Sequence, residues 1–191
     1  MDYNKKLGET LDLINKHHES SESLIKKDGE NLKKWVKTER EWVALVERNR
    51  MEKISKKEFD GFYSEDCYLV FNSNLSKKNE VFLWIGSESK KEETCVAIEL
   101  LNWIAKELNG QIVLHRELQN NESPAFLGLF QPFFSLKGTF WNSLQKSPSK
   151  FKTRLLFVQD RSKLLEAIQV PLTWKSLTCD EPFVLDFGKE V

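Results

Sequence analysis

The stretch that decides the fold runs from Cys67 to Leu108 and reads CYLVFNSNLSKKNEVFLWIGSESKKEETCVAIELLNWIAKEL. Its two apolar segments, 67–71 and 80–86, are rich in β-branched and aromatic residues, which are typical of buried strands. A polar turn that starts at Asn72 separates them. This spacing predicts an antiparallel hairpin.

A long helix is predicted after the hairpin, from about Lys91 to Leu108, because apolar residues recur there at helical intervals. Asn109-Gly110 follows as its C-terminal cap. At about 100° per residue, one face holds the apolar positions and must lie on the sheet. Those predicted core positions are Ala97, Ile98, Leu101, Ile104, Ala105 and Leu108.

The opposite face of this helix is unusual, because it carries Trp103 and Val96 around a centre near Glu99. Cys95 and Lys106 flank the same face. An indole is costly to leave in water, so something must cover it. Two interpretations stay open: the N-terminal extension or the linker at 145–152 covers the face, or a partner protein does.

Shorter elements surround the long helix. The predicted strands are short and apolar, and they span residues 41–46, 111–116, 133–136, 155–158 and 183–186. A short helix begins near Pro124, since proline is favoured in the first turn. The order strand-strand-helix-strand-helix-strand indicates a mixed sheet with helices packed on it, an α+β or α/β layer fold.

Residues 1–40 differ from the rest, because they are highly charged and hold apolar residues at helical intervals. Asp28-Gly29 is expected to break or cap a helix there. The segment is either a helical or partly disordered solvated extension, or a regulatory or partner-binding helix. The polar, basic stretch 145–152 predicts a domain boundary.

Composition excludes several classes of function. Lys+Arg and Asp+Glu both number 29, so a chain-wide attraction to nucleic acid or anionic membrane is not expected. The three cysteines have no motif spacing and predict free thiols in a reducing compartment, the cytoplasm. No apolar run approaches the roughly 20 residues of a membrane span. No catalytic or phosphate-binding motif occurs, so the chain is not expected to be an enzyme. His115, on a predicted strand, is interpreted as structural.

Two acids suggest a weaker possibility. Asp66 begins a predicted strand, and Glu93 lies in the first turn of the long helix. Carboxylates from two elements, with backbone carbonyls, suit a hard cation such as calcium. Alternatively, Glu93 complements the helix dipole and Asp66 sits in a turn.

Several of these segments together resemble a gelsolin-type domain. They are FYSEDCY at 62–68, FLWIG at 82–86, EET at 92–94, HRE at 115–117 and ESPAFLGLF at 122–130. The tail, 170–177 with 183–188, is similar to the start of a second domain in the gelsolin, severin and villin family. The resemblance implies an α+β fold, with a five- or six-stranded mixed sheet between a long and a short helix. It covers roughly residues 41–191 and implies a gelsolin-like domain at 41–147 and a linker and truncated second domain at 148–191, which follow the helical or partly disordered extension at 1–40.

The resemblance also implies actin as the partner, with monomer binding and capping of filament barbed ends through the long helix. By position, Val96, Glu99, Trp103 and Lys106 would face actin. A calcium site would map to the side chains of Asp66 and Glu93, with the carbonyl of Glu65 as a further ligand. Because Ala105 and Lys106 stand where the family carries an Asp, the site of the calcium ion shared with actin is expected to be absent or impaired. A chain this short should cap or sequester better than it severs.

Two alternatives accompany this reading. Glu99 and the extension favour a gelsolin-fold scaffold that has lost actin and binds another protein through residues 1–40. The basic residues near the predicted linker favour phosphoinositide binding. They are Lys146, Lys150, Lys152 and Arg154.

Overall fold

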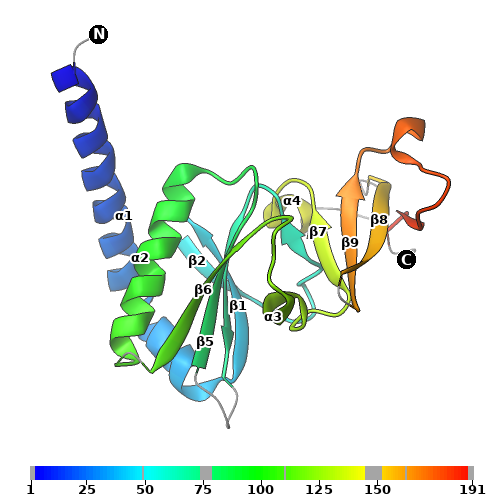
Figure 1. Cartoon of the computed structure of the whole chain (residues 1–191). Helices are drawn as coiled ribbons and strands as arrows, with labels where there is room; N and C mark the ends of the chain where they lie inside the picture. Colours follow the sequence, from blue (N-terminus) through cyan, green and yellow to red (C-terminus); the bar gives the residue numbers. More distant parts are fainter. Residues whose placement is uncertain are drawn as a thin grey trace. The chain divides into compact units, whose positions relative to one another are not determined.

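The computed structural model describes residues 3–48, 50–73, 79–109, 111–144, 152–161 and 163–188. The chain divides into two compact units, and Figure 1 follows it through both. Unit 1 is formed by Met1–Ser55, Cys67–Ile85 and Ser89–Arg116. Unit 2 is formed by Lys56–Asp66, Gly86–Glu88 and Glu117–Val191.

Unit 1 is built on a five-stranded sheet of order β2-β1-β4-β5-β6. Its strands are β1 (Glu41–Glu47), β2 (Arg50–Ile54), β4 (Cys67–Asn72), β5 (Asn79–Ile85) and β6 (Ile112–Leu118). β4 and β5 form the predicted antiparallel hairpin, with Leu69 opposite Leu83. Five successive residues of β4 are buried, so both faces of this central strand are covered.

The long helix of unit 1 is α2 (Lys91–Glu107), which packs on β1, β4 and β5. Its C-terminus is marked by Asn109, which has a φ of 50°, while Gly110 lies outside the described residues. The helix is confirmed, but the predicted core position Ile98 is wrong, because this side chain is 37% exposed. Its buried residues are Glu93, Val96, Ala97, Leu100, Leu101 and Ile104.

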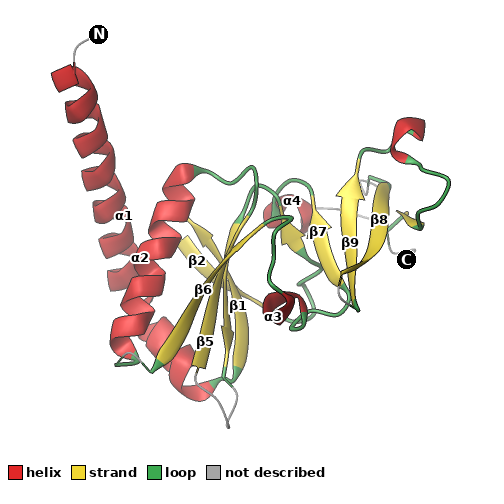
Figure 2. Ribbon diagram, viewed as in Figure 1, coloured by secondary structure: helices red, strands yellow, loops and turns green. Residues whose placement is uncertain are grey.

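The N-terminal extension is one helix, α1 (Tyr3–Thr38), so the break predicted at Asp28-Gly29 is wrong. Figure 2 shows α1 beside α2, on the same side of the sheet of unit 1. Gly29 lies against α2: a Cβ on it would be 3.4 Å from Cζ2 of Trp103. Packing between the two helices therefore outweighs the low helix propensity of glycine.

Unit 2 contains a second five-stranded sheet, of order β10-β8-β9-β7-β3. Its strands are β3 (Phe62–Tyr63), β7 (Phe133–Leu136), β8 (Arg154–Arg161), β9 (Leu164–Val170) and β10 (Phe183–Asp186). β7 pairs in parallel with β3 and β9, while β8 pairs antiparallel with β9 and β10. The sheet is therefore mixed, and sheets with packed helices place the chain in the predicted α+β class.

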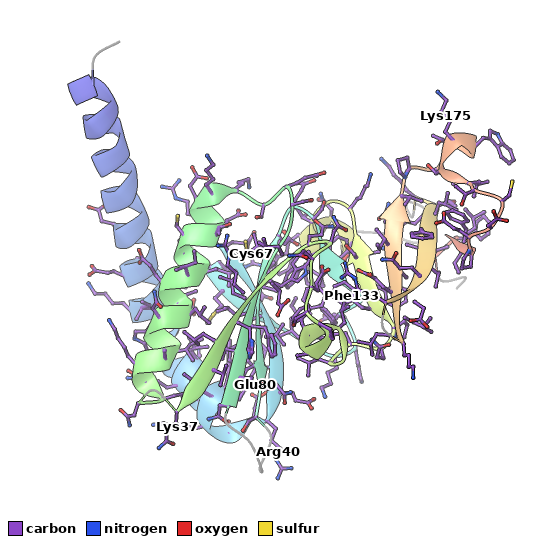
Figure 3. The ribbon with its side chains drawn as sticks, viewed as in Figure 1. Lys37, Arg40, Cys67, Glu80, Phe133 and Lys175 are labelled. Atoms are coloured by element: carbon purple, nitrogen blue, oxygen red, sulfur yellow. The ribbon has the colours of Figure 1, made fainter. Side chains whose placement is uncertain are left out.

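An aromatic cluster forms the core of unit 2 around Phe133, which Figure 3 labels. Phe62 stacks on Phe133 with ring centroids 5.2 Å apart, and Phe126 lies 5.2 Å from Phe62. Phe126 belongs to the short helix α3 (Pro124–Leu127), which has proline in its first turn as predicted. The backbone N–H of Phe126 donates to Oγ of Ser123 at 3.2 Å, which caps this helix. Two further short helices are α4 (Phe140–Leu144) and the 3-10 turn η2 (Trp174–Ser176).

The division predicted from the sequence, with a boundary between 147 and 148, stays a prediction. Residues 145–151, which hold that boundary, lie outside the described residues. Because β7 pairs with β9, unit 2 draws on segments from both sides of the boundary.

Candidate functional site

The outer arc of α2, defined as Val96, Glu99, Trp103 and Lys106, is the surface that the sequence singled out. The structure splits this set by exposure. Val96 is 0% exposed and belongs to the hydrophobic core of unit 1, and Trp103 is partly buried against that core. Glu99 is also partly buried, and Lys106 is exposed. The expectation that Val96 is accessible is therefore wrong in this structure.

Helix α1 is what lies over Trp103. The indole atoms nearest to a Cβ built on Gly29 are at 3.4 and 3.6 Å, so a side chain at this position would be in van der Waals contact with the ring. Lys33 Nζ lies 5.7 Å from the centroid of the same indole, a cation–π distance. Of the two open interpretations, covering by the N-terminal extension is therefore the arrangement in this structure.

The inner face of α1 is apolar, which explains why it packs on α2. Leu24 and Leu32 are 1% and 0% exposed and belong to the same core cluster as Val96. Burying each such side chain contributes about 1.5–3 kcal/mol. The C-terminal end of α1 packs on the sheet, where the rings of Trp35 and Trp42 lie 5.9 Å apart.

A charged contact accompanies the apolar one. Lys33 Nζ lies 3.5 Å from Glu107 Oε2 on α2 and 3.5 Å from Glu30 Oε1 on α1. The carboxylates of Glu107 and then Glu30 raise the pKa of Lys33. Both partners of the pair between helices are about one third exposed, at 32% and 33%, so solvent screens the attraction.

The part of α2 left uncovered is narrower than the sequence suggested. Its exposed residues near the outer arc are Ile98, Asn102 and Lys106. Helical-wheel reasoning assumed that α2 packs on one partner only, so it centred the buried face too far from Val96. The apolar spacing of Leu24, Leu32 and Trp35 in the extension was the signal that a second partner existed.

Asp66, the first predicted calcium ligand, lies in unit 2 and is 6% exposed. Its Oδ2 accepts a hydrogen bond from the backbone N–H of Phe140 at 2.7 Å. The carbonyl of Asp66 accepts from the backbone N–H of Gly86 at 3.0 Å. Glu65 is exposed, and its N–H donates to the carbonyl of Gly138.

Glu93, the second predicted ligand, belongs to unit 1 and is 9% exposed. Its Oε1 lies 3.3 Å from Nζ of Lys90. Carboxylates suit calcium in kind. Among the residues that the structure describes, however, no group of three or more His, Cys, Asp or Glu side chains is placed to hold a metal ion. The ligand set is therefore incomplete, and the calcium site stays a prediction.

The predicted basic cluster is only partly within the described structure. Lys146 and Lys150 lie outside the described residues, and Lys152 is exposed. Arg154 Nε donates to Oδ2 of Asp186 at 2.9 Å, which ties β8 to β10. This side chain therefore has a structural role within unit 2.

His115 and the cysteines, whose side chains could in principle take part in catalysis, also lie within the described part of the structure. His115, on β6 as predicted, stacks on Phe82 with ring centroids 4.3 Å apart. Its Nε2 lies 3.5 Å from Glu80 Oε1. The three cysteines are free thiols. Among the helices that the structure describes, none has the length and apolar character needed to cross a membrane.

Comparison with known families shows one match. Residues 48–127 match the family model described as the gelsolin repeat. The matched range begins after α1 ends at Thr38, so it contains α2 but not the helix that lies over it.

Curated relatives agree with this match. Gelsolin-like protein 2 of Lumbricus terrestris is 30% identical over 141 residues, which cover 70% of this chain and 38% of that protein. Macrophage-capping protein of Mus musculus is 28% identical over 151 residues, covering 76% of this chain and 43% of that protein. Gelsolin of Gallus gallus is 29% identical, and the chain spans 20% of its length. The chain therefore spans less than half the length of each of these relatives.

A similar solved structure is that of a Thorarchaeota 2DGel3 complex with rabbit actin. The match has a TM-score of 0.43 and 23% sequence identity, and it covers 76% of this chain and 71% of that chain.

Proposed function

Because the chain belongs to the gelsolin family, we propose that it is a non-enzymatic actin-binding module that binds monomers and caps filament barbed ends through the outer arc of α2. One observation carries the proposal. The outer arc lies inside the matched gelsolin repeat, yet α1, which lies over Trp103 of this arc, lies outside that repeat.

The residues of the outer arc would make different kinds of contact with actin. Trp103 and Val96 supply apolar area, and a tryptophan is a favoured anchor at protein interfaces. Lys106 supplies a positive charge at the exposed edge. Glu99, which is partly buried, lies between them on the same face.

Finer aspects of the function belong to the same proposal. The module works in the cytoplasm, where its partner is found and where free thiols persist. It severs filaments weakly or not at all by itself. Calcium regulation through Asp66 and Glu93 is part of the proposal and has its own test below.

Elongation of filaments from seeds with pyrene-labelled actin tests this function. The full chain should slow barbed-end elongation at micromolar concentration. Lys106→Glu should weaken the effect about threefold to tenfold, because it puts a negative charge at the rim of the contact. Lys57→Glu makes the same charge change at an exposed loop residue of unit 2 and should leave the effect unchanged.

Full-rate elongation in the presence of the wild-type chain, with and without calcium, would rule out capping. Equal loss in Lys106→Glu and Lys57→Glu would mean that net charge matters and that α2 is not the contact.

The scaffold alternative is favoured by the length of α1. At about 1.5 Å per residue, its 36 residues extend roughly 54 Å, against roughly 26 Å for the 17 of α2. Figure 1 shows the N-terminal part of α1 running past the end of α2. If the scaffold reading holds, deletion of residues 1–40 removes every captured partner and actin never binds. Retained actin binding after that deletion excludes it.

A further inference from the structure

We propose that α1 is an intramolecular competitor of actin: it occupies the outer arc of α2, and actin binds only when α1 is displaced. This inference rests on the proposed function and adds a mechanism of control to it. The part of α1 that matters is the segment from Leu24 to Lys33.

The first step of the argument is that the two partners need the same atoms. Trp103 is in contact range of Gly29, and Val96 is fully buried in the cluster that contains Leu24 and Leu32. A partner that used Trp103 and Val96 could not reach them with α1 in place. Binding of α1 and binding of actin to this face are therefore mutually exclusive.

The second step is that α1 contacts two different elements along its length: α2 through the segment from Leu24 to Lys33, and the sheet near its C-terminus. Near its C-terminus α1 is held by the sheet: Trp35 packs on Trp42, and Lys53 Nζ lies 5.2 Å from the Trp35 ring while also pairing with Glu39. This end can stay attached when the contact with α2 opens. The protein would thus keep its competitor tethered close to the face that it competes for.

The third step is that the contact over Trp103 is held by apolar burial, through Leu24 and Leu32, and only weakly by its polar part. Its ion pair, Lys33 with Glu107, is partly exposed, and such pairs contribute little. The residue of α1 beside the indole is Gly29, and glycine is the least helix-forming residue after proline. A partner can therefore displace this segment when it buries comparable apolar area against α2.

The energetic consequence follows from population arithmetic. When only a fraction of the molecules has the face open, the apparent Kd equals the intrinsic Kd divided by that fraction. Substitutions that weaken the α1 contact should tighten actin binding, although they lie outside the actin-binding face.

Lys33→Glu is the first opening variant, because it places like charges at Glu107 and Glu30. Isothermal titration with monomeric actin should show affinity about threefold to tenfold tighter than that of the wild-type chain. Lys34→Glu, the same charge change at the exposed neighbouring residue, should leave the affinity unchanged. The charge swap Lys33→Glu with Glu107→Lys should return the affinity toward the wild-type value.

Gly29→Leu is the second opening variant, and it separates α1 from α2 because its side chain is larger. Leucine favours the helix more than glycine does, but its side chain would overlap the indole that already lies 3.4 Å from the position of Cβ. It should tighten actin binding without loss of helix content in the circular dichroism spectrum.

Hydrogen exchange of residues 95–107, measured without actin, reports the opening directly. Faster exchange in Lys33→Glu and Gly29→Leu together with tighter actin binding is the expected result. Faster exchange with unchanged actin affinity overturns the competition and leaves the proposed function standing. Unchanged exchange in both variants also overturns it, because α1 would then not control this face. If the opened variants and the wild-type chain all fail to bind actin, both the competition and the proposed function are wrong.

Discussion

At the scale of single residues, Gly29 shows how tertiary packing decides what a local signal means. In the sequence, Asp28-Gly29 predicts a helix break, yet the helix runs through it because the indole of Trp103 fills the space beside the missing side chain. A methyl group at this position would still make an ordinary contact at 3.4 Å.

Gly29→Ala should therefore stabilise unit 1, because alanine favours the helix by about 0.5–1 kcal/mol over glycine. Thermal unfolding followed by circular dichroism should show a higher Tm. Gly138→Ala provides the contrast. That residue has a φ of 90° with open space around it, so the methyl group meets no atom but strains the backbone and should lower the Tm.

Tyr63 is a buried hydroxyl that is tied to an exposed acid. Its Oη donates to Oδ2 of Asp60 at 2.8 Å. Burial raises the pKa of Tyr63 above its ordinary value, and the charge of Asp60 acts in the same direction. Tyr63→Phe removes this hydrogen bond and should lower the free energy of unfolding by about 1–2 kcal/mol at neutral pH.

The pH dependence of this variant has a definite sign. Above about pH 10 the unfolded chain releases the Tyr63 proton while the folded chain keeps it, so the wild type loses stability as pH rises. The stability gap between wild type and Tyr63→Phe should therefore shrink above pH 10 in urea titrations. A constant gap up to pH 11 would contradict this account.

At the scale of elements, the end of β5 depends on close approach of two backbones. Gly86 N–H donates to the carbonyl of Asp66, and a Cβ on Gly86 would lie 2.2 Å from the carbonyl oxygen of Ser64. Because that neighbour is backbone, it cannot move aside as a flexible side chain would.

Gly86→Ala should accordingly cost about 3 kcal/mol of unfolding free energy, which is measurable by urea unfolding of the purified variant. Its soluble yield should fall as well. A variant with wild-type stability would show that the chain can relax around the new methyl group.

The hairpin β4–β5 and helix α2 were predictable from sequence because each has a strong local pattern, such as the apolar run at 67–71. β2 and β9 were missed for the opposite reason. Arg50–Ile54 is charged and Leu164–Val170 lacks strict alternation, so their pairing with β1 and with β8 and β7 decides their structure. Neither partner can be read from the strand itself.

At the scale of the whole molecule, the candidate site was half predictable. The sequence identified α2 and the odd character of Trp103, and it named the N-terminal extension as one possible cover. It could not show that Val96 is fully buried, because the phase of a helix between two partners depends on both of them. Asp66 and Glu93 belong to different units. The calcium site that was predicted from these two residues remains a prediction.

Calcium binding is testable at this scale by thermal unfolding. Millimolar calcium should raise the Tm of the wild-type chain by about 2–4 °C, because a ligand that binds only the folded state stabilises it. Asp66→Asn and Glu93→Gln should each abolish the rise, whereas Glu92→Gln, a neighbour outside the predicted ligand set, should keep it. A rise of equal size in all four proteins would assign the ion to another place.

The C-terminal part of unit 2 exposes large apolar side chains to solvent: Trp174 is 89% exposed and Phe187 is 67% exposed. Val184 and Leu185 add to it on β10, the terminal strand of its sheet. Exposed edge strands and exposed apolar patches favour self-association. Concentrated solutions of the protein are expected to become turbid, and the protein is expected to adsorb to plastic surfaces. In co-pelleting assays the protein spun without filaments should leave a sizeable sediment, which must be subtracted before any binding is claimed.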